Sequence, residues 1–401
     1  MILGGGIAGL YAAHQLLKHN PDQKLIIVEQ KNRLGGRIHT YIDKNMTVEI
    51  GASRFSSKHT LLLKLLDEFH LSKKIEPIES SFEVAEPSPY NLKFVLGKII
   101  AFSKIDLIHD LTKLSFLNYA KLVVSKEEVQ YIEDSFGYYT ELVVMNAKNS
   151  IELLLQLNDE FYSLKGGLTQ LIDRLEDRLR LYPNLEIHYE EEVVSIQPIN
   201  NQLIKTNNHY IIKTNKTTYT TPFCICTLPS NALKKIDFFR QIDSFLNQIT
   251  TSPLCRIYCN FDTKWFKHLP KMTTKSPLRM IIPYSKNTVV FYSDNKYANY
   301  WQDIYEKHGV HGVNKAIKYY VKEVLNIDIK PIHTKVFYWP HGVGYWTIQS
   351  DKEFTSTFLQ HPFPHFYMCG EHYSASFHQW MEGALETSQQ VVDKLINDFY
   401  K

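Results

Sequence analysis

The sequence predicts an α/β fold built on a parallel sheet, and three observations support this. Residues 1–3 form a short apolar strand that runs through a glycine-rich turn into a helix. Residues 24–29, KLIIVE, form an apolar run that ends in an acid, as buried parallel strands do. The last apolar strand, at residues 365–372, leads into a C-terminal helix at residues 380–399. Strands that alternate with helices in this way predict βαβ units.

The elements between these two ends follow from the hydrophobic period. Apolar residues recur at helical spacing in three segments, which we expect to form packing helices: 59–71, 119–136 and 167–181. Between residues 185 and 226 the period shortens and Asn-rich turns separate short strands, one of them at residues 202–205. Further strands are predicted at 255–261, 278–283, 288–293 and 332–338.

Length and composition indicate a globular chain with room for two cores. It has 401 residues, of which 44% are hydrophobic. The net charge of +3, without a basic stripe, argues against a nucleic acid partner. The five cysteines form no C-x-x-C pair and no Cys/His zinc spacing, so we expect no metal and a reducing, cytoplasmic setting. Because no apolar run reaches about 18 residues, we expect a soluble protein without a membrane partner.

The first glycine motif, Gly4-x-Gly6-x-x-Gly9, lies at the turn between the first strand and the first helix. Glycines there let backbone N–H groups approach a pyrophosphate at the helix N-terminus, where the peptide dipoles favour negative charge. Glu29 follows Gly9 by 20 residues and ends the second strand, where a carboxylate accepts hydrogen bonds from ribose hydroxyls. The motif therefore predicts dinucleotide binding, and a purely structural turn is the alternative.

A second glycine pair, in Leu34-Gly35-Gly36-Arg37, follows that strand within reach of the same phosphates. The glycines allow close approach, and Arg37 supplies a permanent charge with forked donors. Nicotinamide-binding units have no need of this second element, so it favours FAD as the dinucleotide. The alternative is a surface turn with a solvated arginine.

Several segments resemble, in this order, the flavin-containing amine oxidase family, which includes monoamine, polyamine and L-amino-acid oxidases. They are GGGIAGL, VEQKNRLGGR, VEIGASRF, LKGGLTQL, EEVVSI, CTLPSNAL and GEHYSASFHQWMEGALETS. The resemblance implies a Rossmann-like FAD-binding domain of the glutathione-reductase-like type, with an inserted α+β substrate domain. The FAD-binding domain would comprise residues 1–58, 160–235 and 355–401, and the substrate domain residues 59–159 and 236–354.

The resemblance also implies which residues bind FAD. Glu29 would hold the adenosine ribose, Val193 the adenine through its main chain, and Arg37 with the second glycine pair the phosphate and flavin side. Glu371 would hold a ribityl or phosphate-side oxygen. Met381 would offer its backbone N–H to the flavin C2 carbonyl, because a helix N-terminus stabilises negative charge on reduced flavin. The predicted set is Gly4, Gly6, Ile7, Ala8, Gly9, Glu29, Gly35, Gly36, Arg37, Gly51, Ala52, Ser53, Arg54, Val193, Gly370, Glu371 and Met381.

The cysteines bear on how FAD is held. Family members with covalent flavin use a cysteine in the segment that matches WPHGVGYWTIQS, but no cysteine occurs between Cys259 and Cys369. We therefore expect FAD to be bound non-covalently. Cys224 and Cys226, spaced by one, are expected to face a strand core as small hydrophobic residues.

The implied activity is oxidation of a C–N bond. Hydride passes from the carbon that bears nitrogen to flavin N5, the resulting imine is hydrolysed, and O2 reoxidises the flavin to give H2O2. In monoamine and polyamine oxidases two aromatic side chains flank the substrate nitrogen. Trp380 replaces the usual tyrosine of one wall, and Tyr345 or Trp346 would form the other; core packing is the alternative for this pair. Trp339 would either line the pocket or pack in the interior.

Two arginines bear on the chemistry and the substrate. Arg256 takes the place of a family lysine that assists oxygen, and arginine does not act as a base. We therefore expect slow use of O2, with a remote role on an exposed strand as the alternative. Arg54, in GASRFSSKH, resembles the arginine with which L-amino-acid oxidases grip the substrate carboxylate. A structural role near the flavin is the alternative.

The substrate is expected to be a small amine or L-amino acid. Polyamines stay open because the middle of the chain offers acids, among them Glu141, Glu152, Asp159 and Glu160, that the sequence does not place. Two other functions also stay open. One is a flavin-binding protein with little or no turnover, which the arginine at position 256 suggests, and the other is a related FAD-dependent desaturase or isomerase.

Overall fold

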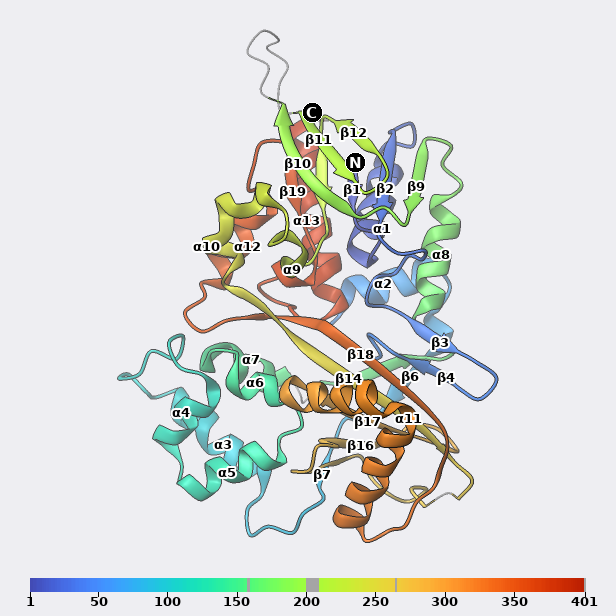
Figure 1. The fold of residues 1–401 in the computed structure, drawn as a ribbon. Coiled ribbons are helices and arrows are strands. Elements are labelled where there is room, and N and C mark those ends of the chain that lie inside the picture. The colour runs from blue at the N-terminus through green and yellow to red at the C-terminus, as the bar shows by residue number, and fades with distance from the viewer. Residues whose placement is uncertain (157–158, 200–208, 264, 400–401) are drawn as a thin grey trace.

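The computed structural model describes residues 1–156, 159–199, 209–263 and 265–399. Its first sheet has five strands in the order β19-β13-β1-β2-β9, and every neighbouring pair is parallel (Figure 1). The strands are β1 (Ile2–Leu3), β2 (Leu25–Glu29), β9 (Leu185–Tyr189), β13 (Cys224–Cys226) and β19 (Phe366–Met368). The prediction of an α/β fold with a parallel sheet is confirmed.

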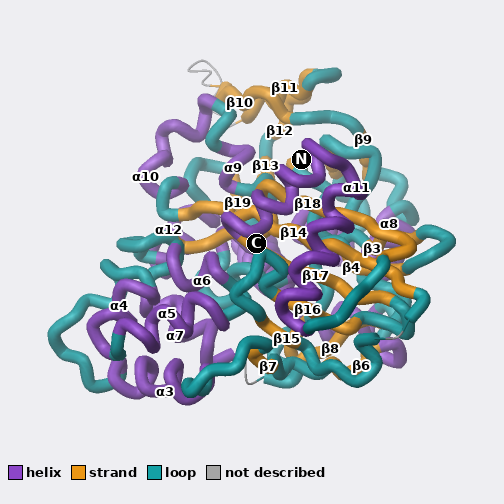
Figure 2. Tube along the Cα trace, turned by 60° about the horizontal axis from the view of Figure 1, so that its bottom comes forward, coloured by secondary structure: helices purple, strands orange, loops and turns teal. Residues whose placement is uncertain are grey.

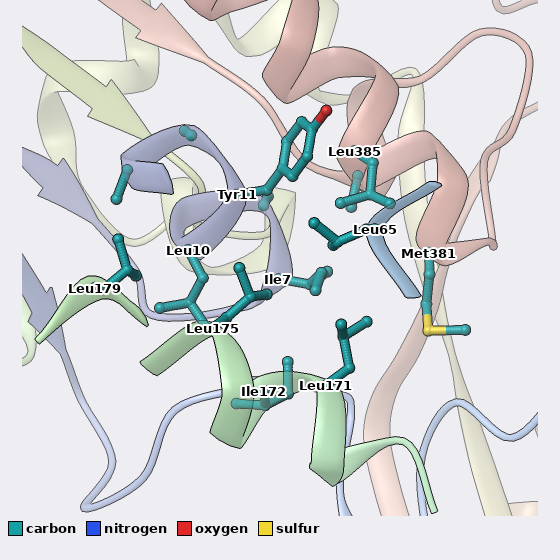
Figure 3. Packing of buried hydrophobic residues seen from close by; sticks show 14 of the residues in the cluster. Ile7, Leu10, Tyr11, Leu65, Leu171, Ile172, Leu175, Leu179, Met381 and Leu385 are labelled. Atoms are coloured by element: carbon teal, nitrogen blue, oxygen red, sulfur yellow. The ribbon is translucent and has the colours of Figure 1, made fainter. Parts of the chain in front are cut away.

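Helices of widely separated sequence form a core against this sheet. They are α1 (Ile7–His19), α2 (Thr60–Glu68), α8 (Thr169–Leu179) and α13 (Met381–Phe399). Figure 3 shows Leu10 of α1, Leu175 of α8 and Leu385 of α13 converging in this core, and all three side chains are fully buried. A fully buried leucine contributes about 1.5–3 kcal/mol. The core therefore joins the two ends of the chain around the first glycine turn.

An antiparallel meander and short helices form a second core together with the parallel sheet. Cys224 and Cys226 are fully buried in this core, as expected from their spacing. Burial also raises the pKa of both thiols. The elements of this region are β10 (Val193–Ile199), β11 (His209–Thr214), β12 (Thr218–Thr221), α9 (Ser230–Leu233), α10 (Asp243–Leu246) and α12 (Lys352–Gln360).

A six-stranded sheet, in the order β18-β14-β17-β16-β15-β7, occupies the other half of the molecule (Figure 1). Helix α11 (Asn295–Leu325) packs on it and is kinked at Gly309, whose φ is +58°. The two longest strands, β14 and β18, pair with each other and exceed their predicted lengths. The strands are β7 (Glu83–Val84), β14 (Ile249–Phe261), β15 (Met272–Thr273), β16 (Met280–Pro283), β17 (Thr288–Asp294) and β18 (Pro331–Trp346).

Five helices gather at one corner of the molecule (Figure 2). The sequence predicted one helix over residues 119–136, but the chain breaks there into α4 and α5. Val124 is extended, with φ −127° and ψ 167°. Ser125 then caps a new helix through a capping box with Glu128. The break leaves backbone N–H groups at the start of α5 without helical partners, and the capping box satisfies them. The five are α3 (Leu92–Ser103), α4 (Phe116–Val123), α5 (Lys126–Ser135), α6 (Tyr139–Val143) and α7 (Ala147–Gln156).

Short strands join the two halves. A hairpin and a three-stranded sheet are formed by β3 (Thr40–Ile42), β4 (Thr47–Glu49), β5 (Phe55–Ser56), β6 (Ile75–Ile78) and β8 (Phe161–Leu164). The strand predicted at residues 202–205 lies outside the described residues. Within the described ranges, no helix is both long enough and apolar enough to cross a membrane.

Candidate functional site

The carboxyl ends of four parallel strands meet at one edge of the first sheet. Gly4 follows β1, Glu29 ends β2, Thr227 follows β13 and Gly370 lies just beyond β19; all four line a cavity of about 1270 Å³. This edge is where open α/β sheets bind ligands. The volume exceeds the roughly 300–1,000 Å³ that a drug-sized ligand requires, so the cavity can hold an elongated group together with a second, smaller molecule.

The two glycine stretches of the sequence are in direct contact. The Gly35 N–H donates to the Gly5 carbonyl oxygen at 2.8 Å, and Gly6 pairs with Gly35 in a parallel bridge. Gly4, Gly35 and Gly36 have φ values of +107°, +94° and +59°, which favour glycine. The two turns together form the glycine cradle (residues 4–6 and 35–36), of which Gly4, Gly6, Gly35 and Gly36 line the cavity.

Gly6 is the member of the cradle whose missing side chain leaves space for a ligand. A Cβ there would meet no atom closer than the Gly36 Cα at 4.0 Å, although Gly6 lines the cavity. Gly6 is the N-cap of helix α1, which has no side-chain cap and no acidic residue in its first turn. Its free N–H groups and its dipole therefore suit an anion in the cavity.

Gly9 has a different role from the one that was predicted. It does not line the cavity among the described residues, and a Cβ there would lie 2.1 Å from the Gly4 carbonyl oxygen. The prediction that Gly9 contacts the ligand is therefore corrected. Its lack of a side chain instead lets α1 pack closely against the turn that precedes it.

Glu29 is buried, with 6% of its surface exposed, and its position is fixed by two backbone donors. Its Oε2 accepts from the Gly5 N–H at 2.8 Å and its Oε1 from the Lys31 N–H at 2.9 Å. A carboxylate has about four acceptor sites, so Glu29 keeps acceptors for a ligand. Val193, the residue predicted to contact adenine, lines the same cavity.

Arg37 and Glu371 form an ion pair at the cavity wall. The Glu371 carboxylate also accepts from the Gly344 N–H at 3.2 Å and the Gln379 N–H at 2.9 Å. Burial raises the pKa of Glu371, but His372 and Arg37 outweigh burial and hold this pKa well below its usual range. Glu371 is thus ionised, and protein donors occupy both of its oxygens. Its clearest effect is to position Arg37.

Aromatic side chains surround Arg54 in the same cavity. The guanidinium carbon lies 4.8 Å from the ring centre of Phe161, 5.6 Å from that of Trp380 and 5.8 Å from that of Tyr138. One Nη donates to the Tyr138 hydroxyl at 2.9 Å. Trp380 stacks on Phe161, and its indole N–H has no partner within the described part of the chain. The structure thus brings together Arg54 and Trp380, two residues that the sequence analysis assigned to the substrate.

Arg256 is not an exposed strand residue with a remote role. One Nη donates to the Glu49 carbonyl oxygen at 2.8 Å, and the other donates to the Ser53 Oγ at 3.1 Å. Burial lowers the pKa of Arg256, but Tyr258 and Tyr292 raise it above its usual value, so the group stays charged. Arg256 lines the cavity and holds the segment 51–54, which also lines it.

Tyr345 and Trp346 point to opposite sides of β18, because side chains alternate along a strand. Tyr345 lines the cavity, whereas Trp346 lies in the core beyond it and donates its indole N–H to the Ser374 carbonyl oxygen at 2.9 Å. The prediction of Trp346 as a wall of the substrate pocket is therefore wrong. Trp339 lines the cavity and donates to the Ile50 carbonyl oxygen at 2.6 Å.

The other predicted site residues all line the cavity, but the sequence missed several neighbours. Residues 165–167 and 227–229 also line it, and both lie in segments that carry the family resemblance. Two glycines of the first segment have positive φ, so this glycine pair could have indicated a turn at the cavity. Tyr138, Glu141 and Lys271 had no such signal, because only the tertiary fold brings them to the cavity.

Comparison with known proteins agrees with this geometry. The family model of the flavin containing amine oxidoreductases matches residues 7–92 and 100–396, and the chain belongs to this family. An L-amino-acid oxidase of Crotalus adamanteus is 21% identical over 96% of this chain and 84% of its own length. A flavin-dependent L-tryptophan oxidase of Lentzea aerocolonigenes is 34% identical over 20% of this chain. The structure of wild-type putrescine oxidase bound to putrescine superposes with a TM-score of 0.76, at 15% identity over 99% of this chain and 98% of that chain.

The protein is therefore a flavoprotein oxidoreductase with FAD as its cofactor. The resemblance inferred from the sequence segments is confirmed. The low identities leave the roles of single residues and the substrate to be inferred from the site.

Proposed function

We propose that the cavity holds FAD along its length and that the enzyme with FAD bound oxidises an L-amino acid. The glycine cradle and the start of α1 would hold the pyrophosphate, with Glu29 and Val193 on the adenosine side. Two features support the fit: the open space beside Gly6 and the uncapped helix N-terminus next to it. We propose further that residues 1–58, 160–235 and 355–401 form the FAD-binding domain, since they supply all five strands of the parallel sheet.

The flavin end would lie between the start of α13 and Arg256. Both Met381 and Arg256 line the cavity, and each brings positive potential, one from a helix N-terminus and one from a fixed charge. All five cysteines are free and buried, and none of them is among the described cavity-lining residues, which supports non-covalent binding. FAD bound there would supply the hydride acceptor for oxidation of the carbon that bears nitrogen.

Arg54 is the residue that favours an amino acid over a simple amine as the substrate. Its guanidinium lies in the cavity among aromatic rings, and it forms no ion pair with any residue in the described part of the chain. A planar guanidinium can bind a carboxylate through two parallel hydrogen bonds. Trp380 and Tyr345 would flank the reacting carbon and nitrogen and keep water away from them. The relatives named as L-amino-acid oxidases support this choice.

The test compares L-phenylalanine with phenylethylamine, which lacks the carboxylate, in anaerobic flavin reduction. A hydrogen bond to a charged group is worth about 1.5–3 kcal/mol, so Arg54→Ala should slow reduction by the amino acid about 10- to 100-fold. Reduction by the amine should change little. Arg54→Lys keeps the charge but loses the forked pair of donors. Its rate of reduction by the amino acid should lie between those of the wild type and Arg54→Ala. Equal losses for both substrates would contradict the carboxylate role.

A flavin-binding protein with little turnover is the second candidate, favoured by the arginine at position 256. This candidate predicts that no amino acid or amine in a broad panel bleaches the yellow protein under anaerobic conditions. Bleaching by an amino acid followed by slow recovery in air would instead support the oxidase, with oxygen activation limited by Arg256.

A further inference from the structure

Helix α6 brings an unsatisfied carboxylate to the cavity. The Glu141 side chain lines the cavity and is only 8% exposed. The Glu141 backbone oxygen accepts a hydrogen bond from Ser150, but its carboxylate has neither a hydrogen bond nor an ion pair with any described residue. A buried carboxylate without a partner is unfavourable. A ligand in the cavity could therefore supply the hydrogen-bond donor that the Glu141 carboxylate lacks.

The position of this carboxylate is fixed by the surrounding fold. Asp294, at the end of β17, accepts from the backbone N–H groups of Tyr139 and Thr140 at 3.0 and 2.8 Å. The Thr140 hydroxyl lies 2.7 Å from the Ser252 hydroxyl of β14. Ser150 Oγ donates to the Glu141 carbonyl oxygen at 2.8 Å. These contacts tie α6 to the large sheet, so Glu141 belongs to a built site and not to a loose surface segment. Figure 1 shows where α6 lies in the fold.

The charges around Glu141 come from several elements. Burial and the nearby Asp294 raise the pKa of Glu141 to about 8, and Arg54 opposes this shift. The hydroxyls of Tyr138, Tyr292 and Tyr345 are the other titratable groups that interact with it. A cationic partner in the cavity would favour the ionised carboxylate.

We propose that Arg54 and Glu141 form a two-point site for an L-amino acid whose side chain ends in an ammonium group, such as L-lysine or L-ornithine. This inference rests on the proposed function, because Arg54 must hold the α-carboxylate. The ammonium group would donate to Glu141, and the aliphatic stem of the side chain would pack against Leu153 and Tyr345, which line the same cavity and share one hydrophobic cluster. A purely apolar side chain would leave Glu141 unpaired, and an acidic one would be repelled by it.

Paired substrates test this two-point site. L-Lysine and L-norleucine differ mainly in the terminal ammonium group, so their ratio of kcat/KM isolates the contribution of Glu141. Glu141→Gln keeps the shape of the side chain and removes its charge. We expect it to lower this ratio at least 30-fold, mainly through the KM of lysine, while norleucine oxidation changes less than threefold. Glu141→Asp should restore part of the ratio. Glu152→Gln, on the neighbouring helix α7 and paired with Lys352, is the matched control and should leave the ratio unchanged.

A binding measurement removes the dependence on turnover. Titration of the holoenzyme with 6-aminohexanoate and with hexanoate, followed by the flavin spectrum, should show tighter binding of the amino compound in the wild type. The two ligands should bind equally to Glu141→Gln. The lysine-to-norleucine ratio should also rise with pH around 8 in the wild type, because Glu141 must ionise to pair, and stay flat in Glu141→Gln.

The outcomes separate the two proposals. Normal oxidation of L-norleucine with an unchanged lysine ratio in Glu141→Gln would overturn the ammonium site and leave the oxidase intact. A preference for L-glutamate or L-glutamine over L-lysine would also overturn the ammonium site. Lys271, which lines the same cavity, could bind the side-chain carboxylate of L-glutamate. Failure of every amino acid to reduce the flavin would overturn the proposed function itself. Equal binding of the two hexanoates to the wild type would overturn the ammonium site even then.

Discussion

Replacing Gly6 by alanine tests whether the glycine cradle holds the pyrophosphate of FAD. Gly6 has φ −74° and ψ 176°, a conformation that alanine adopts without strain. The new Cβ would meet no protein atom closer than 4.0 Å but would enter the cavity. Folding should therefore change little: loss of glycine at the start of α1 costs up to about 1 kcal/mol.

The effect on FAD should be much larger than the effect on folding. If the pyrophosphate lies in the cradle, a methyl group there would displace it from at least one N–H group. A hydrogen bond to a charged group is worth about 1.5–3 kcal/mol, so we expect FAD to bind about 10- to 100-fold more weakly. Quenching of flavin fluorescence on titration of the apoprotein measures the affinity, and urea unfolding of the same apoprotein measures its stability.

The matched control is Gly97→Ala in α3, where a Cβ would meet nothing within 4 Å. This change should stabilise the helix by about 1 kcal/mol and leave FAD affinity unaltered. If Gly6→Ala binds FAD as tightly as the wild type, the pyrophosphate does not lie beside Gly6. The assignment of the cradle would then be refuted.

The remaining predictions concern oxygen and pH. Arg256→Lys should speed reoxidation by O2 in stopped-flow mixing, because lysine can release a proton. The same substitution should lower the free energy of unfolding by about 1 kcal/mol, since one ammonium cannot replace both hydrogen bonds to Glu49 and Ser53. Burial lowers the pKa of His378 from 6.5 to about 4, so its neutral form stabilises the fold above pH 6.5 and this stability is lost as pH falls toward 4. Between pH 7 and pH 5 the loss should be about 2 kcal/mol in urea unfolding, and His378→Leu should remove it.

Clear results would contradict each of these two predictions. An unchanged reoxidation rate in Arg256→Lys would separate this arginine from oxygen chemistry and leave it a structural clamp on the segment 51–54. The same pH dependence in His378→Leu and in the wild type would show that other groups cause the loss of stability in acid.

Much of the cofactor end could be predicted because its chemistry is local in sequence. The turn after the first strand, the acid that ends the second strand and the glycine pair after it all lie within residues 1–37. Glycines at positive φ and an acid at a strand end leave a signal in any short window. The same reasoning failed for Gly9, since spacing does not tell a glycine that faces a ligand from one that packs against a turn.

The substrate end could be predicted only in part. Short segments with a family resemblance predicted Arg54 and Trp380, and both line the cavity. Whether Tyr345 or Trp346 faces the cavity depends on the register of β18 with β14. A shift by one residue exchanges the two faces of a strand. Likewise, the break at Val124 depended on a capping box that helical periodicity alone does not reveal.

The sequence by itself determined the class of fold, the nature of the cofactor and the glycine-rich segments that we propose for its phosphates, because these follow from patterns between neighbours in the chain. Only the tertiary structure decided that Arg256 clamps the segment 51–54 and that Glu141 and Arg54 line one cavity. Such pairings join residues that are far apart in the chain. They depend on how the large sheet, helix α6 and the parallel sheet pack together, which no local pattern encodes.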